Sequence, residues 1–317
     1  MSAEGAWDRA LLAAALCLAR PDLFGGLIVK AGAGPVLEAW LDEVRAQCPS
    51  ETAPMVVPAS VSPDRLHASL SVSRSLAEGR AIYQPGLLED AAGRAMIVNG
   101  AERLQEAVAA LLAAELDPAS GERSRQTALI CIDESREAGD AVSPILAERL
   151  AFRADLNGLR FTGIGAASYT AADIDRIRTD LSKVEMVDED LSAVAAACLG
   201  MGVSSLQVPV FCMHGARAIA ALERRTSVTR DDIMLACQLT LPGRGQPMPE
   251  PEDMRQPETG QQDGQSDEAS SGEEQDGVSE TPQPLESQII EAIESAPVEM
   301  MAPKTRATSR GRAGVSG

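Results

Sequence analysis

The sequence predicts an α/β domain with a parallel sheet, followed by a small helical domain and a disordered tail. Up to about residue 165, short apolar segments alternate with stretches of helical periodicity, which is the pattern of parallel strands joined by helices. From 166 to 245 the periodicity is helical throughout. From 246 to 317 Gly, Pro, Gln, Ser and acidic residues prevail, with little to bury. We therefore expect three parts with these boundaries.

The first part begins with a helix at 7–20, which stops at Pro21 and leads into a buried strand at 27–29. A glycine turn follows. The later elements of this part are expected in alternation: a helix at 35–48, a strand at 55–57, a turn into a short helix at 83–88, a strand at 95–98, a helix at 102–116, a strand at 128–132 and a helix at 144–152. The second part is expected to hold helices at 172–183, 188–200, 210–225 and 229–239.

The charge is strongly negative and concentrated in the tail. The 317 residues carry a formal net charge of −19, which argues against nucleic acid as the main partner. Fifteen acidic residues and one Arg lie between 249 and 301, and the last sixteen residues are basic. Acidic segments of this composition most often act as solvated tethers between domains.

The cysteines and the apolar segments indicate a cytoplasmic protein. None of the six cysteines forms a CxxC pair, so we expect reduced, buried thiols and no zinc site. The apolar run 10–19 has no basic segment before it, as a signal peptide would. No apolar stretch is long enough to span a membrane.

The glycine turn after the first strand has the outline of a phosphate-binding loop. Gly32 and Gly34 would let backbone N–H groups approach a nucleotide's phosphates at a helix N-terminus. The loop nevertheless lacks the usual Lys and Ser or Thr, because Pro35 and Val36 stand in their place. Proline has no N–H, and valine cannot bind a metal. Either the loop is a degenerate phosphate site or it is an ordinary strand–turn–helix connection.

The carboxylates that an ATPase needs are also displaced. The second long strand ends in Val98-Asn99, where an acidic pair would hold Mg²⁺ and polarise water. The next strand does end in Asp133-Glu134. These two residues either form a relocated acidic pair or simply open a solvated loop.

Few other side chains are candidates for chemistry. Arg149 could reach a neighbouring subunit's phosphates as an arginine finger, or it could be a surface arginine on a short helix. Lys30 precedes the glycines and is better explained as a strand-end lysine. His67 and His214 share no metal-ligand spacing, and no metal site is expected.

Seven segments, taken in order, resemble the N-terminal part of the D subunit of magnesium chelatase, an AAA+ relative of the ATP-hydrolysing I subunit. The segments are 25–29, 32–36, 84–88, 101–104, 148–152, 216–223 and 228–233. The similarity spans about residues 5 to 245, and the acidic linker that follows also fits. The family's D subunit continues into an integrin-type domain with a DxSxS metal site, and no DxSxS occurs in this sequence.

The resemblance implies an AAA+ P-loop core with a helical lid and a division of labour between subunits. The I subunits would bind ATP with Mg²⁺ and hydrolyse it, and the H subunit would hold the porphyrin. This chain would form a non-hydrolysing platform in a homo- or hetero-oligomeric ring. The complex inserts Mg²⁺ into protoporphyrin IX on the way to chlorophyll or bacteriochlorophyll.

The resemblance also implies roles for single residues. Arg149 falls at the arginine-finger position, and Asp133 and Glu134 fall just after the sensor-1 strand. The sensor-2 arginine maps near His214, with Arg217 one turn further on.

Two other functions stay open. The chain could be an ATP-hydrolysing or nucleotide-sensing AAA+ protein that uses Asp133 and Glu134. It could also be a non-enzymatic scaffold that acts through its acidic tail.

Overall fold

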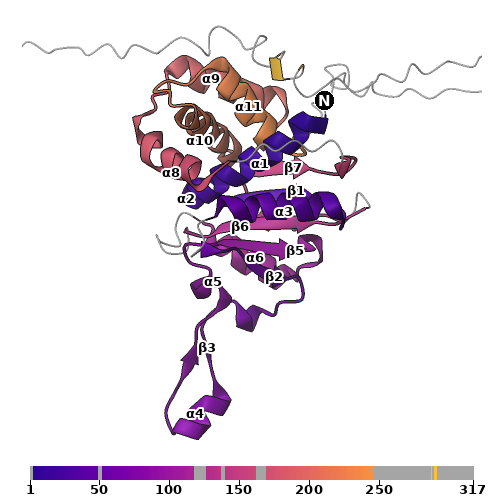
Figure 1. The fold of residues 1–317 in the computed structure, drawn as a ribbon, viewed down its shortest axis with the longest axis vertical. Helices are drawn as coiled ribbons and strands as arrows, with labels where there is room; N and C mark the ends of the chain where they lie inside the picture. The colour runs from indigo at the N-terminus through magenta and orange to yellow at the C-terminus, as the bar shows by residue number, and fades with distance from the viewer. Residues whose placement is uncertain are drawn as a thin grey trace, which may run out of the picture.

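The computed structural model describes residues 3–48, 52–117, 126–136, 140–161 and 169–245, together with Ser287, Ile289 and Ile290. Figure 1 shows an α/β core with a helical domain at one end and a narrow arm that extends from the other. The segment 246–317, which is expected to be disordered, lies outside the described residues apart from those three.

The predicted parallel sheet is confirmed. Its five strands are β1 (Gly26–Lys30), β2 (Met55–Pro58), β5 (Ala95–Asn99), β6 (Ala128–Asp133) and β7 (Phe152–Asp155). All neighbours are parallel, in the order β2-β5-β6-β1-β7. Strands β1, β5 and β6 are almost wholly buried because both faces of the sheet are covered.

Alternate residues of the central strands pack on opposite faces of the sheet. Leu27 and Val29 join the cluster formed with α1 (Ala3–Ala19) and α3 (Pro35–Gln47). Ile28 joins the cluster on the other face, where α6 (Glu106–Glu115) and α7 (Pro144–Ala147) pack. This alternation follows from the two-residue period of a strand. Helix α1 is buried along most of its length, which explains its nearly uniform apolar sequence.

The helical domain follows the core along the chain. It consists of α8 (Ala171–Asp180), η7 (Leu181–Lys183), α9 (Asp188–Gly200), α10 (Gln207–Leu222) and α11 (Arg230–Thr240). Helix α10 packs against α8, α9 and α11, while α8 rests on α1 and α11 on β7. The helical domain is therefore joined to the core at the first helix and the edge strand.

Two predicted helices are corrected. The expected helix at 144–152 is wrong, because α7 ends at Ala147 and Phe152 begins the edge strand β7. Phe152 is buried and its ring centroid lies 4.8 Å from that of Phe24, so burial against the core decides the conformation. The helix expected at 102–116 is shorter than predicted: Gly100 adopts a left-handed conformation, η3 (Ala101–Arg103) follows, and α6 begins only at Glu106.

The arm was not predicted. It consists of the antiparallel strands β3 (Ser69–Leu70) and β4 (Tyr83–Gln84) with α4 (Val72–Glu78) at its tip. The other short elements are α2 (Pro21–Phe24), η2 (Pro63–Arg65) and α5 (Leu87–Asp90). All six cysteines are free thiols, and five of them are buried. Across the described residues, none of the helices combines the length and the apolar character that crossing a bilayer requires.

Helix α11 begins with a partly buried ion pair, between Arg225 and the buried Asp232, that should make the helical domain acid-sensitive. Asp232 accepts hydrogen bonds from Arg225 at 2.5 and 2.7 Å and from the Thr229 N–H and hydroxyl at 2.8 Å each. Burial opposes ionisation, but Arg225 and Thr229 outweigh it and hold the pKa of Asp232 below its ordinary value. The stabilisation is therefore present above the unfolded-state pKa of about 3.9 and is lost as the pH falls through the lower folded-state pKa.

We expect Asp232→Asn to reduce the free energy of unfolding by about 1–3 kcal/mol at pH 7, since it leaves Arg225 without its charged partner. Urea unfolding at several pH values measures this. The matched change Asp231→Asn, at the exposed neighbour, should have little effect. If the loss in free energy of unfolding caused by Asp232→Asn stayed constant below pH 4, the charged form of Asp232 would not be the source of the stabilisation.

Candidate functional site

The predicted phosphate-loop residues meet the acidic candidates at one edge of the sheet. The glycine loop joins β1 to α3, with Pro35 as the first residue of the helix. Because the strands are parallel, the loop lies at the same edge as Asn99 and Asp133, the last residues of β5 and β6. Strand β6 stands directly beside β1, and the Ala31 N–H donates to the Asp133 carbonyl at 2.9 Å. Val98 is buried within β5 and faces the core.

The glycine loop has a hydrogen-bond partner within its own chain. The Gly32 N–H donates to Oδ1 of Asn157 at 3.1 Å. Asn157 is held in turn, since its own N–H donates to Asp155 Oδ1 at 2.8 Å. One amide of the loop is therefore occupied by a side chain that follows β7. Asn157 is not among the residues predicted from the sequence, although the Asp155-Leu156-Asn157-Gly158 turn directly after a strand indicates it.

The carboxylates near the loop already have ion-pair or hydrogen-bond partners within the chain. Glu134 accepts from Arg103 at 2.9 Å, and Arg103 also binds Glu102 at 2.6 Å. The Glu102 side chain is 5% exposed and accepts the Glu134 N–H at 3.1 Å. Asp133 is buried and accepts the Ser135 N–H at 2.9 Å. Glu102 is a second residue that sequence reasoning missed, because its role depends on a contact with a segment 32 residues away.

These residues do not fit a complete site for ATP with Mg²⁺. The loop offers no ammonium group after its glycines and no hydroxyl, and Pro35 removes one N–H. Asn99 stands where β5 would need a carboxylate. Within the part of the chain that the structure describes, no three His, Cys, Asp or Glu side chains converge as metal ligands would. Lys30 ends β1, in register with Asp133 on one side and Asp155 on the other.

Arg149 lies at the opposite edge of the sheet. It precedes β7, and its backbone carbonyl packs against Gly25, which precedes β1. The length of β1 therefore separates it from the glycine loop of its own chain. Its guanidinium donates to Asp117 at 2.7 Å, and its side chain is 39% exposed.

The surroundings of Arg149 are partly apolar and solvent-exposed. Ile145 on α7 is 52% exposed, and Leu206, just before α10, is 87% exposed. Leu206 lies close to α7 because the neighbouring Ser205 hydroxyl donates at 3.0 Å to Glu148, the residue that follows α7. Exposed aliphatic side chains beside an accessible arginine are typical of a surface that contacts another chain.

His214 and Arg217 are not brought to the glycine loop. Both lie on α10, where Arg217 donates to the carbonyls of Val184 and Leu181 at 3.1 and 3.3 Å. Burial lowers the pKa of His214, and Arg217 and Arg20 lower it further. Arg20 precedes β1 whereas the loop follows it, so His214 faces the other edge of the sheet. Their assignment to sensor 2 stays a prediction.

Comparison with known proteins agrees with this architecture. Residues 191–263 match the AAA lid domain family. The chain is 34% identical to the magnesium-chelatase 60 kDa subunit of Rhodobacter capsulatus, over 77% of this chain and 42% of that protein. It is 26% identical to the magnesium-chelatase 38 kDa subunit of the same organism, over 59% of this chain and 62% of that protein.

A solved structure supports the fold alone. The crystal structure of a proposed ATPase from Cytophaga hutchinsonii superposes with a TM-score of 0.53 at 10% identity, covering 74% of this chain and 79% of that one. The chain matches less than half the length of the 60 kDa relative.

Proposed function

The chain is an AAA+ protein related to the D subunit of magnesium chelatase, and on that premise we propose that it is a non-hydrolysing platform subunit of this enzyme. Its substrates at the level of the complex are Mg²⁺ and protoporphyrin IX. An adjacent I subunit binds and hydrolyses ATP, an H subunit holds the porphyrin, and the whole assembly works in the cytoplasm. The single observation that carries the proposal is the glycine loop, which keeps the strand–turn–helix geometry without its catalytic groups.

The chemistry at the loop supports the absence of hydrolysis. Pro35 and Val36 replace the phosphate-binding Lys and the Mg²⁺-binding hydroxyl. The Gly32 N–H donates to Asn157 instead of to a ligand. Glu134, the half-buried carboxylate of the Asp133-Glu134 pair, forms an ion pair with Arg103 at 2.9 Å.

The position of Arg149 supports a contribution to a neighbouring subunit. It is exposed at the edge of the sheet away from the chain's own loop, among side chains suited to a subunit contact. An arginine supplied in this way stabilises the charge that develops on the transferred phosphoryl group. A contact between neighbouring subunits of the ring would also transmit conformational changes from the ATP-hydrolysing I subunit to this chain.

A specific observation keeps the active-ATPase alternative worth testing. Asp133 ends the strand next to β1, and its backbone binds the start of the glycine loop. If Asp133 held Mg²⁺, Asp133→Asn would abolish hydrolysis by the chain alone.

We expect the chain alone to release no phosphate from ATP with Mg²⁺ above the buffer rate, and Asp133→Asn to leave that result unchanged. A coupled phosphate-release assay measures both. Glu89→Gln, at a carboxylate on α5, serves as the matched control. If the chain alone hydrolysed ATP, and if Asp133→Asn abolished this turnover while Glu89→Gln preserved it, the platform hypothesis would be wrong and the chain would be an active ATPase.

A further inference from the structure

Apolar side chains cover the arm that extends from the core. Leu70 of β3 lies opposite Tyr83 of β4 in the antiparallel ribbon, so the two side chains share one face. Val72 and Leu76, four residues apart, share one side of α4. All four side chains are between 48 and 79% exposed. Exposed apolar side chains gathered in this way mark a surface that contacts another molecule.

The arm has little to stabilise it within its own chain. The strands β3 and β4 and the helix α4 contain no buried residue. The Ile82 N–H donates to the Ser75 hydroxyl at 2.9 Å, and the Ser71 N–H donates to the Ile82 carbonyl at 2.8 Å. A seven-residue helix and a two-stranded ribbon are each only marginally stable in water. A partner that buried the apolar side chains would therefore add stabilisation that the arm's own residues do not supply.

A second exposed apolar surface lies on the helical domain, along α9. It consists of Val187, the residue before the helix, together with Leu191 and Leu199, and these side chains are 56, 38 and 57% exposed. Their spacing of four and eight residues keeps them on one side of the helix. Asp188 and Glu189, in the first turn of α9, are also exposed. We call these five residues the α9 surface.

The charges of the arm and of the α9 surface are complementary. Arg74 on α4 is exposed, and no hydrogen bond or ion pair joins it to another described residue. The other charged residues of the arm, Glu78 and Arg80, pair with each other at 2.8 Å, so the arm is positive overall. The carboxylates of Asp188 and Glu189 likewise form no ion pair within the part of the chain that the structure describes. Complementary charges of this kind favour one partner and one orientation.

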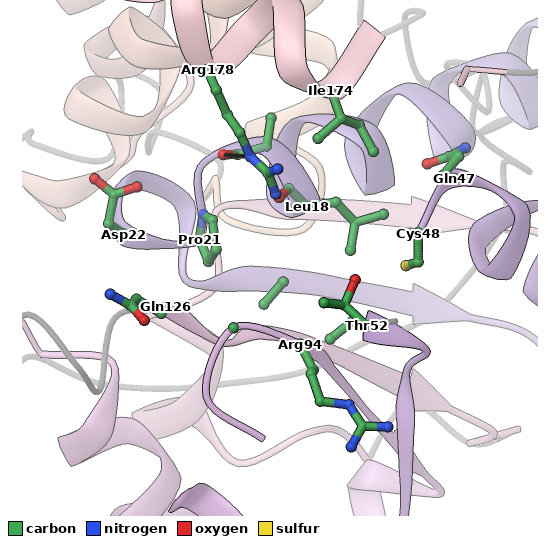
Figure 2. Close-up of a pocket in the computed structure, with 14 residues that line it drawn as sticks. Leu18, Pro21, Asp22, Gln47, Cys48, Thr52, Arg94, Gln126, Ile174 and Arg178 are labelled. Atoms are coloured by element: carbon green, nitrogen blue, oxygen red, sulfur yellow. Dashed lines mark hydrogen bonds between the residues drawn. The ribbon is translucent and has the colours of Figure 1, made fainter. Parts of the chain in front are cut away.

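The two surfaces cannot meet within one molecule. Figure 1 shows the arm and α9 at opposite ends of the chain. The helical domain is fixed on the core at the cavity shown in Figure 2, where Arg178 of α8 points to the end of α1. Its guanidinium donates to the carbonyls of Leu18 and Ala19 at 2.9 and 3.2 Å. The arm can therefore reach the α9 surface only of another molecule.

We propose that the arm of one copy of this chain packs on the α9 surface of a second copy. The apolar side chains of the arm cover those of α9, and Arg74 lies beside the carboxylates of its first turn. The contact joins two different surfaces, so each added copy offers a further arm and a further α9 surface. Such head-to-tail contacts build a closed ring or an open filament. Both surfaces belong to this chain, so the inference does not rest on the chelatase proposal.

Sedimentation velocity of the full chain at increasing concentration tests the contact. The wild type should self-associate at concentrations up to about 100 µM, within the range of weak protein contacts. Leu76→Asp on the arm and Leu199→Asp on α9 should each weaken the association at least tenfold. Both positions are exposed, so the fold should persist, which circular dichroism checks. Phe161→Asp, at an apolar side chain that is 57% exposed and belongs to neither surface, should associate as the wild type does.

A mixture of the two variants tests the head-to-tail arrangement. Leu76→Asp keeps an intact α9 surface, and Leu199→Asp keeps an intact arm. At a concentration where each variant alone is monomeric, an equimolar mixture should form a dimer with one copy of each and nothing larger.

The proposal is overturned if the wild type is monomeric at the highest of these concentrations, whether or not its arm then binds a chelatase I subunit or a vesicle of anionic lipid. It is equally overturned if either variant associates as the wild type does, or if the mixture stays monomeric.

Discussion

In a mixed assembly with the I subunit, Arg149→Ala should reduce ATP turnover by about 10³-fold at the ATP sites of I subunits that lie next to this chain. These are the sites to which this chain would supply the arginine. The magnitude is that of an arginine finger supplied to a neighbouring phosphoryl-transfer site. The fold should survive, because the ion pair of Arg149 with Asp117 is only partly buried, and ion pairs near the surface contribute about 1 kcal/mol or less. Turnover of the mixture under saturating ATP with Mg²⁺ measures the effect.

Two variants separate this role from a merely structural one. Arg80→Ala removes an exposed arginine that is likewise paired with a nearby carboxylate and should leave turnover unchanged. Arg149→Lys keeps the charge but loses the planar fork of donors, so it should restore little activity. If Arg149→Ala assembled normally and hydrolysed ATP as fast as the wild type, the arginine would have no part in hydrolysis.

Gly26→Ala should strongly destabilise the core. A Cβ at this position would stand 1.9 Å from the Leu129 carbonyl oxygen of β6. The obstacle is backbone in the neighbouring strand, so it cannot rotate away, and β1 would have to separate from β6. We expect a loss of more than about 4 kcal/mol in the free energy of unfolding, which is a large fraction of the roughly 5–15 kcal/mol that ordinarily stabilises a domain.

Gly32→Ala is the matched control, because nothing lies within 4 Å of a Cβ at Gly32. We expect it to change the free energy of unfolding by less than about 0.5 kcal/mol, as open surface positions do. Thermal and urea unfolding of both variants measure the contrast. Equal stability of the two variants would show that β1 and β6 do not approach each other as described.

The parts of the fold that could be predicted are those that local sequence determines. Strands β1, β5 and β6 are runs of buried apolar residues, and such runs in a sequence predict buried strands. Strand β7 (Phe152–Asp155) has only four residues and closely follows a helix. So short a segment shows no clear strand period, and the sequence therefore predicts that the helix continues to Phe152. The strands of the arm have two residues each, too few for any period to show.

The candidate site divides in the same way. The glycine loop and its missing Lys could be seen in one stretch of sequence. The contact between Gly32 and Asn157 joins residues 125 positions apart, and only the order of the strands brings them together.

Native mass spectrometry of the chain mixed with a chelatase I subunit, with and without ATP and Mg²⁺, tests the platform role most directly. The account predicts a mixed assembly that forms with nucleotide and is absent or smaller without it. A mixture that stays as separate species under both conditions, while the chain alone hydrolyses ATP, would contradict it.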